Sequence, residues 1–248
     1  MPSDIAEIAW TTVFLDLPVS QVAAGTAFWI AVTGGELSGR RGDHHQFVTV
    51  LPPDGDAYLR IQTVRSGDPG THLDLHSGDQ WALARRAEHL GATVVSHQDD
   101  LVVLRSPGGY VFCAVHWDGE HRRPGPLGRP GAASTLDQLC LDIPADGYDD
   151  EVRFWSALTG WEVGQGELAE FRWLRRPPRQ ALRLLLQRLD SPATRVTGHL
   201  DLAADDVDHE VARHVALGAE VHRRQTHWTT LIDPAGLRYC LTHRRAST

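Results

Sequence analysis

The sequence predicts an α+β fold of four βαβββ units that form two similar halves. The length of 248 residues suits one large domain or two small ones. A content of 42% hydrophobic and 23% charged residues is that of an ordinary globular protein. The third observation is an internal repeat, which gives both halves the same order of elements.

The repeat is clearest in residues 72–113, which align with residues 199–240 at a constant offset of 127 and without a gap. In this block 15 of 42 pairs are identical. Upstream the offset becomes 126, so that LDLP at 15–18 matches LDIP at 141–144. One-residue changes of offset between matched blocks indicate short loop insertions within a duplicated fold.

A stretch rich in Gly, Pro and Arg separates the two copies and is nearly free of apolar residues. Such a composition is typical of a connecting segment. We therefore expect a linker at residues 118–134, with the first half at residues 1–117 and the second at residues 135–248.

In the first unit, the β-branched residues 8–16 predict a strand, and residues 19–33 predict a helix that ends at Gly34. Short strands are expected near residues 45–51 and 57–64.

In the second unit, residues 71–76 predict a strand, and Asp79 is expected to cap a helix that runs through His89 and stops at Gly91. The next strands are expected near residues 92–96, 101–105 and 110–116. The second half should repeat both units.

The net charge of −8 comes from 24 basic and 32 acidic residues. All 24 basic residues are Arg, which excludes Schiff-base chemistry and the phosphate-binding lysine of a Walker motif. A net negative charge is unlike the basic footprint of a general nucleic-acid binder, so no nucleic-acid partner is expected.

Three cysteines, odd in number and far apart, predict neither a disulfide framework nor a CxxC zinc site. The N-terminal residues lack the basic and apolar regions of a signal peptide. No apolar run reaches the ~18 residues of a membrane span. We expect a cytoplasmic protein with no membrane partner, either a monomer or a homodimer.

The motif HLDL at 72–75, a helix that ends in LGA, and DPAG followed by a strand with YC resemble the glyoxalase/bleomycin-resistance/extradiol-dioxygenase group. This is the vicinal oxygen chelate superfamily, and the resemblance to its glyoxalase-like branch covers about residues 8–116 and 135–243. It implies two glyoxalase-like halves, each with a cleft between curved mixed sheets. The group includes lyases, isomerases, epimerases, dioxygenases and drug-binding proteins that do no chemistry.

Strand alternation brings polar residues onto one face in each half, because alternate residues of a strand share a face. Along residues 71–76, His72, Asp74 and His76 share the face opposite Leu73 and Leu75. Polar groups on apolar walls are typical of a small-molecule site. The candidate ligand-binding residues are Arg60, Gln62, His72, Asp74, His76 and Cys113 in the first half, and Gln187, His199, Asp201 and Cys240 in the second.

The resemblance also implies positions for metal ligands. Carried over by position, they are Ala9, Gln62, His72 and Cys113 in the first half, and Thr135, Gln187, His199 and Cys240 in the second. The group's first-strand His and last-strand Glu are missing from both. Because neutral amides are poor ligands for a catalytic divalent ion, we expect no metal and no other cofactor.

One alternative stays open for the first half. Adjacent same-face residues lie ~6.6 Å apart along a strand, so His72, Asp74 and His76 cannot easily close on one ion. Chelation by a pair of them, helped by Cys113, could still hold a divalent metal. The two cysteines are otherwise expected to pack as small apolar core residues rather than to act as nucleophiles.

We interpret the chain as a small-molecule-binding protein of the bleomycin-resistance type, with a metal-free cleft for an aromatic or natural-product compound. The alternative is a glyoxalase-like lyase or isomerase that uses His72 as catalytic base or residual metal ligand. A dioxygenase is less favoured, since ferrous iron takes two imidazoles and a carboxylate. The first half is the expected recognition site, because the second has Ala203 in place of His76 and Leu185 in place of Arg60.

Overall fold

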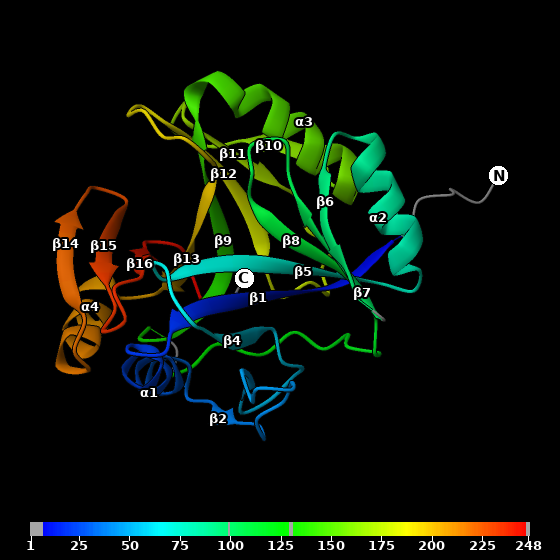
Figure 1. The fold of residues 1–248 in the computed structure, drawn as a ribbon. Helices are drawn as coiled ribbons and strands as arrows, with labels where there is room; N and C mark the ends of the chain where they lie inside the picture. The colour runs from blue at the N-terminus through cyan, green and yellow to red at the C-terminus, as the bar shows by residue number, and fades with distance from the viewer. Residues whose placement is uncertain (1–6, 99, 129–130, 247–248) are drawn as a thin grey trace. The chain divides into compact units, whose positions relative to one another are not determined.

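A computed structural model describes residues 7–98, 100–128 and 131–246. Within these ranges the strands form two eight-stranded mixed sheets (Figure 1). The strand order is β2-β3-β4-β1-β5-β8-β7-β6 in the first sheet and β10-β11-β12-β9-β13-β16-β15-β14 in the second. The two orders are equivalent, which confirms the predicted α+β fold of four βαβββ units in two similar halves.

The first half holds two βαβββ units. Its elements are β1 (Ile8–Pro18), α1 (Val22–Thr33), β2 (Glu36–Leu37), β3 (Phe47–Leu51), β4 (Leu59–Val64), β5 (Gly70–Ser77), α2 (Gln80–His89), β6 (Thr93–His97), β7 (Leu101–Arg105) and β8 (Val111–His116).

The second half repeats this order and adds one 3₁₀ turn, η1, before its first helix. Its elements are β9 (Ser134–Pro144), η1 (Ala145–Gly147), α3 (Tyr148–Thr159), β10 (Val163–Gln165), β11 (Phe171–Leu174), β12 (Arg183–Leu189), β13 (Thr197–Ala204), α4 (Val207–Ala216), β14 (Glu220–Arg224), β15 (Trp228–Ile232) and β16 (Arg238–Thr242).

The chain also divides into two compact units, here called lobes, each of which draws segments from both sequence halves. Lobe 1 consists of Met1–Val13, Thr71–Arg122 and Cys140–Gly198, and lobe 2 of Phe14–Gly70, Arg123–Leu139 and His199–Thr248. The boundaries of the sequence halves, at residues 117 and 135, stay a prediction.

Lobe 1 has an aromatic core between α3 and β8. The rings of Phe112, Phe154 and Trp155 pack edge to face with centroids 5.2 to 5.9 Å apart. Leu73 and Leu75 of β5 are fully buried. This packing buries large apolar surfaces, which is the main favourable term in folding.

Lobe 2 has the equivalent core between α1, α4 and β16. Phe28 and Trp29 of α1 pack against Tyr239 at 5.8 and 5.3 Å, and His214 of α4 packs against Phe28 at 5.7 Å. The helices thus cover the apolar face of the strands in each lobe.

Local signals in the sequence set most element ends. Asp79 caps α2 by accepting a 2.8 Å hydrogen bond from the Ala82 amide, and Gly34 follows α1 with a φ of 64°. The expectation that α1 starts at residue 19 is wrong. The Val19 amide instead donates to the Val64 carbonyl at 3.1 Å, so the helix begins at Val22.

No helix in the described part of the chain is long and apolar enough to cross a membrane.

Candidate functional site

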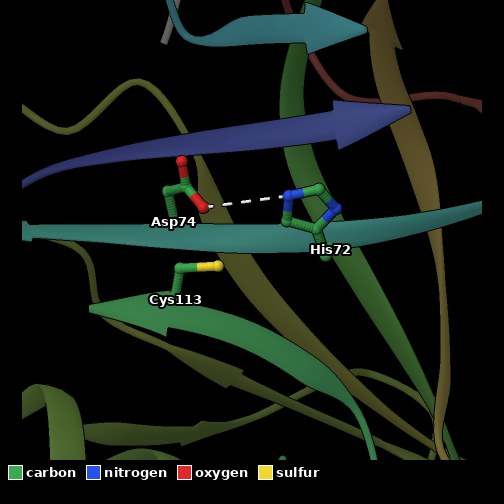
Figure 2. Close-up of side chains that lie close together, drawn as sticks. All are labelled: His72, Asp74 and Cys113. Atoms are coloured by element: carbon green, nitrogen blue, oxygen red, sulfur yellow. Dashed lines mark ion pairs between the residues drawn. The ribbon is translucent and has the colours of Figure 1, made fainter. Parts of the chain in front are cut away.

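Two parallel strands of lobe 1, β5 and β8, carry the polar cluster of the first half. Their register places Asp74 opposite Cys113. Because β5 alternates, His72 and Asp74 point to the same side of the strand, away from Leu73. Figure 2 shows His72 and Asp74 rising from β5, with Cys113 extending from β8 beside them.

The cluster is buried and closely spaced. One ligand atom from each of His72, Asp74 and Cys113 lies within 4.8 Å of the other two. The three residues are 8%, 5% and 7% exposed. Nε2 of His72 is 3.9 Å from Oδ1 of Asp74, which is an ion-pair contact rather than a hydrogen bond. A gap of this length is one that a water molecule or a ligand atom can bridge.

His76 does not join this cluster. Its Nε2 lies 2.9 Å from the hydroxyl oxygen of Thr12 on the neighbouring strand β1, and both residues are buried. The expectation that the three polar residues of β5 do not meet at one point agrees with this arrangement.

Lobe 2 contains the equivalent cluster of the second half. In the parallel pair β13 and β16, Asp201 lies opposite Cys240, and Nε2 of His199 is 3.3 Å from Oδ1 of Asp201. Gln138 of β9 donates a hydrogen bond from its amide nitrogen to Oδ2 of Asp201. Thr230 Oγ1 lies 3.5 Å from the Cys240 sulfur.

Burial controls the protonation of the second cysteine. Burial raises the pKa of the Cys240 thiol, and the neighbouring His199 only partly opposes that effect. The folded protein therefore holds Cys240 as a neutral thiol near pH 7. A neutral thiol is a weak nucleophile and must lose its proton before it can bind a metal.

The remaining predicted site residues are Arg60, Gln62 and Gln187. Arg60 and Gln62 belong to lobe 2, where the β3–β4 register places them opposite Thr49 and Phe47. Gln187 belongs to lobe 1, and its side-chain oxygen accepts a 3.7 Å hydrogen bond from Cys140.

Two contacting residues were missed at the sequence level. Ala9 and Thr135, to which the resemblance carried a metal ligand, stand near the starts of β1 and β9. Two side chains that contact predicted polar site residues from these strands come three positions later: Thr12 contacts His76, and Gln138 contacts Asp201. The offset of 126 pairs these two residues with each other, so the alignment of the two copies could have identified both positions.

The sequence profile of the family described as Glyoxalase-like domain matches the chain twice, at residues 12–115 and 138–242. The chain belongs to this glyoxalase-like family. The double match, together with the equivalent order of strands in the two sheets, confirms two tandem copies of the vicinal oxygen chelate type. No curated protein sequence matches the chain.

Solved structures share the fold of this glyoxalase-like protein at low identity. A xylose isomerase-like TIM barrel/4-hydroxyphenylpyruvate dioxygenase fusion protein is 14% identical with a TM-score of 0.62; the match covers 98% of this chain and 50% of the fusion protein. A single-residue variant of homoprotocatechuate 2,3-dioxygenase from B. fuscum is 13% identical with a TM-score of 0.66, covering 100% of this chain and 74% of that one.

The Mn(II)-bound glyoxalase from Novosphingobium aromaticivorans is 14% identical with a TM-score of 0.58, and the match covers 96% of this chain and 82% of that one. Because these neighbours carry different activities, the family and fold alone leave the specific function open.

The donor atoms of the clusters fit some metals better than others. Imidazole, carboxylate and thiolate groups are all zinc ligands, and a spacing within 4.8 Å is one that zinc, with bonds of about 2.0–2.3 Å, can nearly bridge. A ferrous site of the two-His, one-carboxylate kind needs a second imidazole. Neither the His72 nor the His199 cluster includes one in the described part of the chain.

Proposed function

We propose that the chain is a small-molecule-binding protein of the glyoxalase-like family, and that the cluster of His72, Asp74 and Cys113 recognises the ligand without an obligatory metal. The observation that supports this most is the convergence of three polar side chains, each less than a tenth exposed, on one face of β5 and β8. A polar group of a ligand could hydrogen-bond to these side chains, since an imidazole donates or accepts and a carboxylate accepts.

The sequence favours the first cluster as the recognition site, because the second half has Ala203 in place of His76 and Leu185 in place of Arg60. In the first cluster the His72–Asp74 distance is 3.9 Å. A ligand hydroxyl or amide between imidazole and carboxylate could hydrogen-bond to both, since imidazole can donate or accept and carboxylate accepts.

A glyoxalase-like lyase or isomerase is the second candidate, and the metal-compatible spacing of the donor atoms favours it. His72, Asp74 and Cys113 would hold a zinc ion, which supplies a Lewis acid when bound. Without the ion, His72 would act as a general base that Asp74 orients. The dioxygenase activity of some structural neighbours suits this donor set less, since ferrous iron takes two imidazoles and a carboxylate.

Elemental analysis combined with native mass spectrometry of the purified protein tests the proposal. Binding without a metal predicts far less than one equivalent of zinc, nickel, manganese or iron per chain, together with a retained small-molecule mass. One equivalent of metal that disappears in the His72→Ala variant would replace the proposal with the lyase or isomerase.

The same proposal covers the partner, the location and the oligomeric state of the protein. The partner is a small organic molecule rather than a nucleic acid or a membrane, and the protein acts in the cytoplasm as a monomer or homodimer. Analytical ultracentrifugation distinguishes the two oligomeric states.

A further inference from the structure

Lobe 2 places two arginines beside each other on the polar face of β3 and β4. Arg60 lies opposite Thr49 in the strand register, and Nη2 of Arg41 donates a 2.8 Å hydrogen bond to Oγ1 of Thr49. Burial and, after it, the charge of Arg60 lower the pKa of Arg41. The two guanidinium groups are therefore close enough to repel each other.

A network of hydrogen bonds fixes Arg41 in this position. Its Nη1 donates to the Ser38 hydroxyl at 3.0 Å, and the same hydroxyl accepts a 2.9 Å bond from the Thr49 amide. The loop that follows returns to pair Arg41 with Phe47 through two backbone hydrogen bonds. Within it His45 has a φ of 52°, a conformation that residues other than glycine seldom adopt.

An aromatic surface adjoins the two charges. The Phe14 and Phe47 rings pack edge to face at 6.1 Å, and the Arg60 guanidinium carbon is 5.8 Å from the centre of the Phe14 ring. Phe47 stands opposite Gln62 in the same register. Positive charge thus borders an edge-to-face aromatic pair that lies beside a polar amide.

The fold itself does not require this arrangement. At the matching positions of the second half, Leu185 replaces Arg60 and Cys140 replaces Phe14, yet the strands keep the same order. Two neighbouring arginines on one face are also unusual in a chain whose net charge is −8.

Arg41 is the cation on which the inference depends. In the described part of the chain, no carboxylate lies within ion-pair distance of Arg41. Asp16 follows Phe14 by two positions and so shares its face of β1, which makes a carboxylate available to Arg60. An Arg60–Asp16 pair would still leave the positive charge of Arg41.

We propose that Arg41 and Arg60 bind the anionic group of a small organic ligand, with the Phe14 and Phe47 rings against its planar apolar part. The ligand class is an aromatic carboxylate, and the inference goes beyond the proposed function, because the two arginines belong to lobe 2 and the His72 cluster belongs to lobe 1. A guanidinium binds carboxylate through paired N–H donors in a fixed fork. A bound anion also removes the repulsion between the two cations.

Calorimetry of the full chain with benzoate, benzamide and inorganic phosphate, at constant ionic strength, tests this. Benzoate should bind, and the neutral benzamide should bind about tenfold or more weakly, because it lacks the charge. Arg41→Gln and Arg60→Gln should each weaken benzoate binding by about tenfold. Arg65→Gln, an exposed arginine just after β4, is the matched control and should leave binding unchanged.

The following results would overturn the inference. No benzoate binding, or binding that neither Arg41→Gln nor Arg60→Gln weakens, overturns the inference. Phosphate that binds as tightly as benzoate overturns the aromatic part of it. Circular dichroism and the thermal midpoint of each variant establish that the chain is folded, and Arg41→Lys provides a second variant that keeps the charge but loses the fork.

Failure here is distinguishable from failure of the proposed function. A co-purified neutral ligand that depends on His72, with no benzoate binding, overturns this inference and leaves the proposed function intact. Zinc-dependent turnover overturns the proposed function. The benzoate result would then still show whether the anion site is present.

Discussion

The indole N–H of Trp155 donates a 2.7 Å hydrogen bond to Oε2 of Glu151, one helical turn earlier on α3. The other carboxylate oxygen accepts a hydrogen bond from the backbone amide of Gly108, in the turn between β7 and β8. Glu151 is fully buried. A single carboxylate thus connects α3 to the turn before β8 within lobe 1.

In lobe 2 a carboxylate also accepts a hydrogen bond from a buried indole, but this carboxylate lies in the turn and not on the helix. Trp29 of α1 donates a 2.7 Å hydrogen bond to Asp233, which lies in the turn before β16 and also accepts from the Ala235 and Leu237 amides. In the repeat Trp29 corresponds to Trp155, and Asp233 corresponds to Ser106. In each lobe the buried indole N–H thus has a carboxylate acceptor, which the helix supplies in lobe 1 and the turn supplies in lobe 2.

Glu151→Ala should lower the free energy of unfolding by about 3 kcal/mol, because it leaves the buried indole N–H of Trp155 and the half-buried amide of Gly108 without this acceptor, at ~1–3 kcal/mol each. Urea unfolding at neutral pH measures this. The control is Asp150→Ala, since the Asp150 side chain is exposed and pairs with the exposed Arg153. Equal losses in the two variants would show that the buried carboxylate contributes nothing specific.

The pH dependence of stability should carry the signature of the same carboxyl. Burial raises the pKa of Glu151 above its ordinary value of 4.5, and the hydrogen bonds from Gly108, Trp155 and Ser106 only partly offset this. The folded protein then binds the proton more tightly than the unfolded chain. The contribution of Glu151 to stability therefore falls as pH rises from 4.5 through the raised pKa.

Urea midpoints of the natural protein and Glu151→Gln, measured from about pH 4 to pH 7, test this sign. The natural protein should lose stability relative to the variant as pH rises. Glu162→Gln, at an exposed glutamate that pairs with Arg175, is the control and should show no such trend. A constant difference between the natural protein and Glu151→Gln contradicts the expectation.

His214 should act in the opposite direction. Burial lowers its pKa below 6.5, although Glu210 raises it in part. Because the unfolded chain binds the proton more readily, this contribution is fully present above pH 6.5 and is lost as pH falls toward the lowered pKa. Thermal midpoints at several pH values should depend on acid less steeply in His214→Gln. His209→Gln, at an exposed histidine of the same helix, should keep the natural dependence.

The buried cysteine Cys240 should resist alkylation. Since burial raises its thiol pKa, iodoacetamide near pH 7 should leave it unmodified in the folded protein and label it once urea unfolds the chain. Peptide mass spectrometry identifies the labelled residue. Rapid labelling of the native protein at Cys240 would show a thiolate that the structure does not support.

The sequence alone predicts those parts of the fold that depend on local patterns. Asp79 was identifiable as a helix cap from its type and place, and its side chain does accept from the Ala82 amide. The two-residue strand β2 had no such signal, because only its pairing with β3, where Glu36 meets Leu51, defines it. Contacts of this kind depend on the assembled sheet.

In the candidate site, too, local patterns predict some features and the assembled sheet determines the others. Alternation placed His72 and Asp74 on one face, and the repeat identified Cys113. The parallel register of β5 with β8 was needed to bring Asp74 opposite Cys113, and the order β1-β5 to bring Thr12 to His76. Arg41 was not foreseen, since a loop rather than a strand carries it to Thr49.

Native mass spectrometry of the protein as purified, with His72→Ala and His199→Ala beside it, tests most directly whether the first cluster is a metal-free recognition site. We predict a small-molecule adduct without a metal, lost in His72→Ala and kept in His199→Ala. An adduct that is lost in His199→Ala and kept in His72→Ala, or a metal ion in place of the organic adduct, would contradict it.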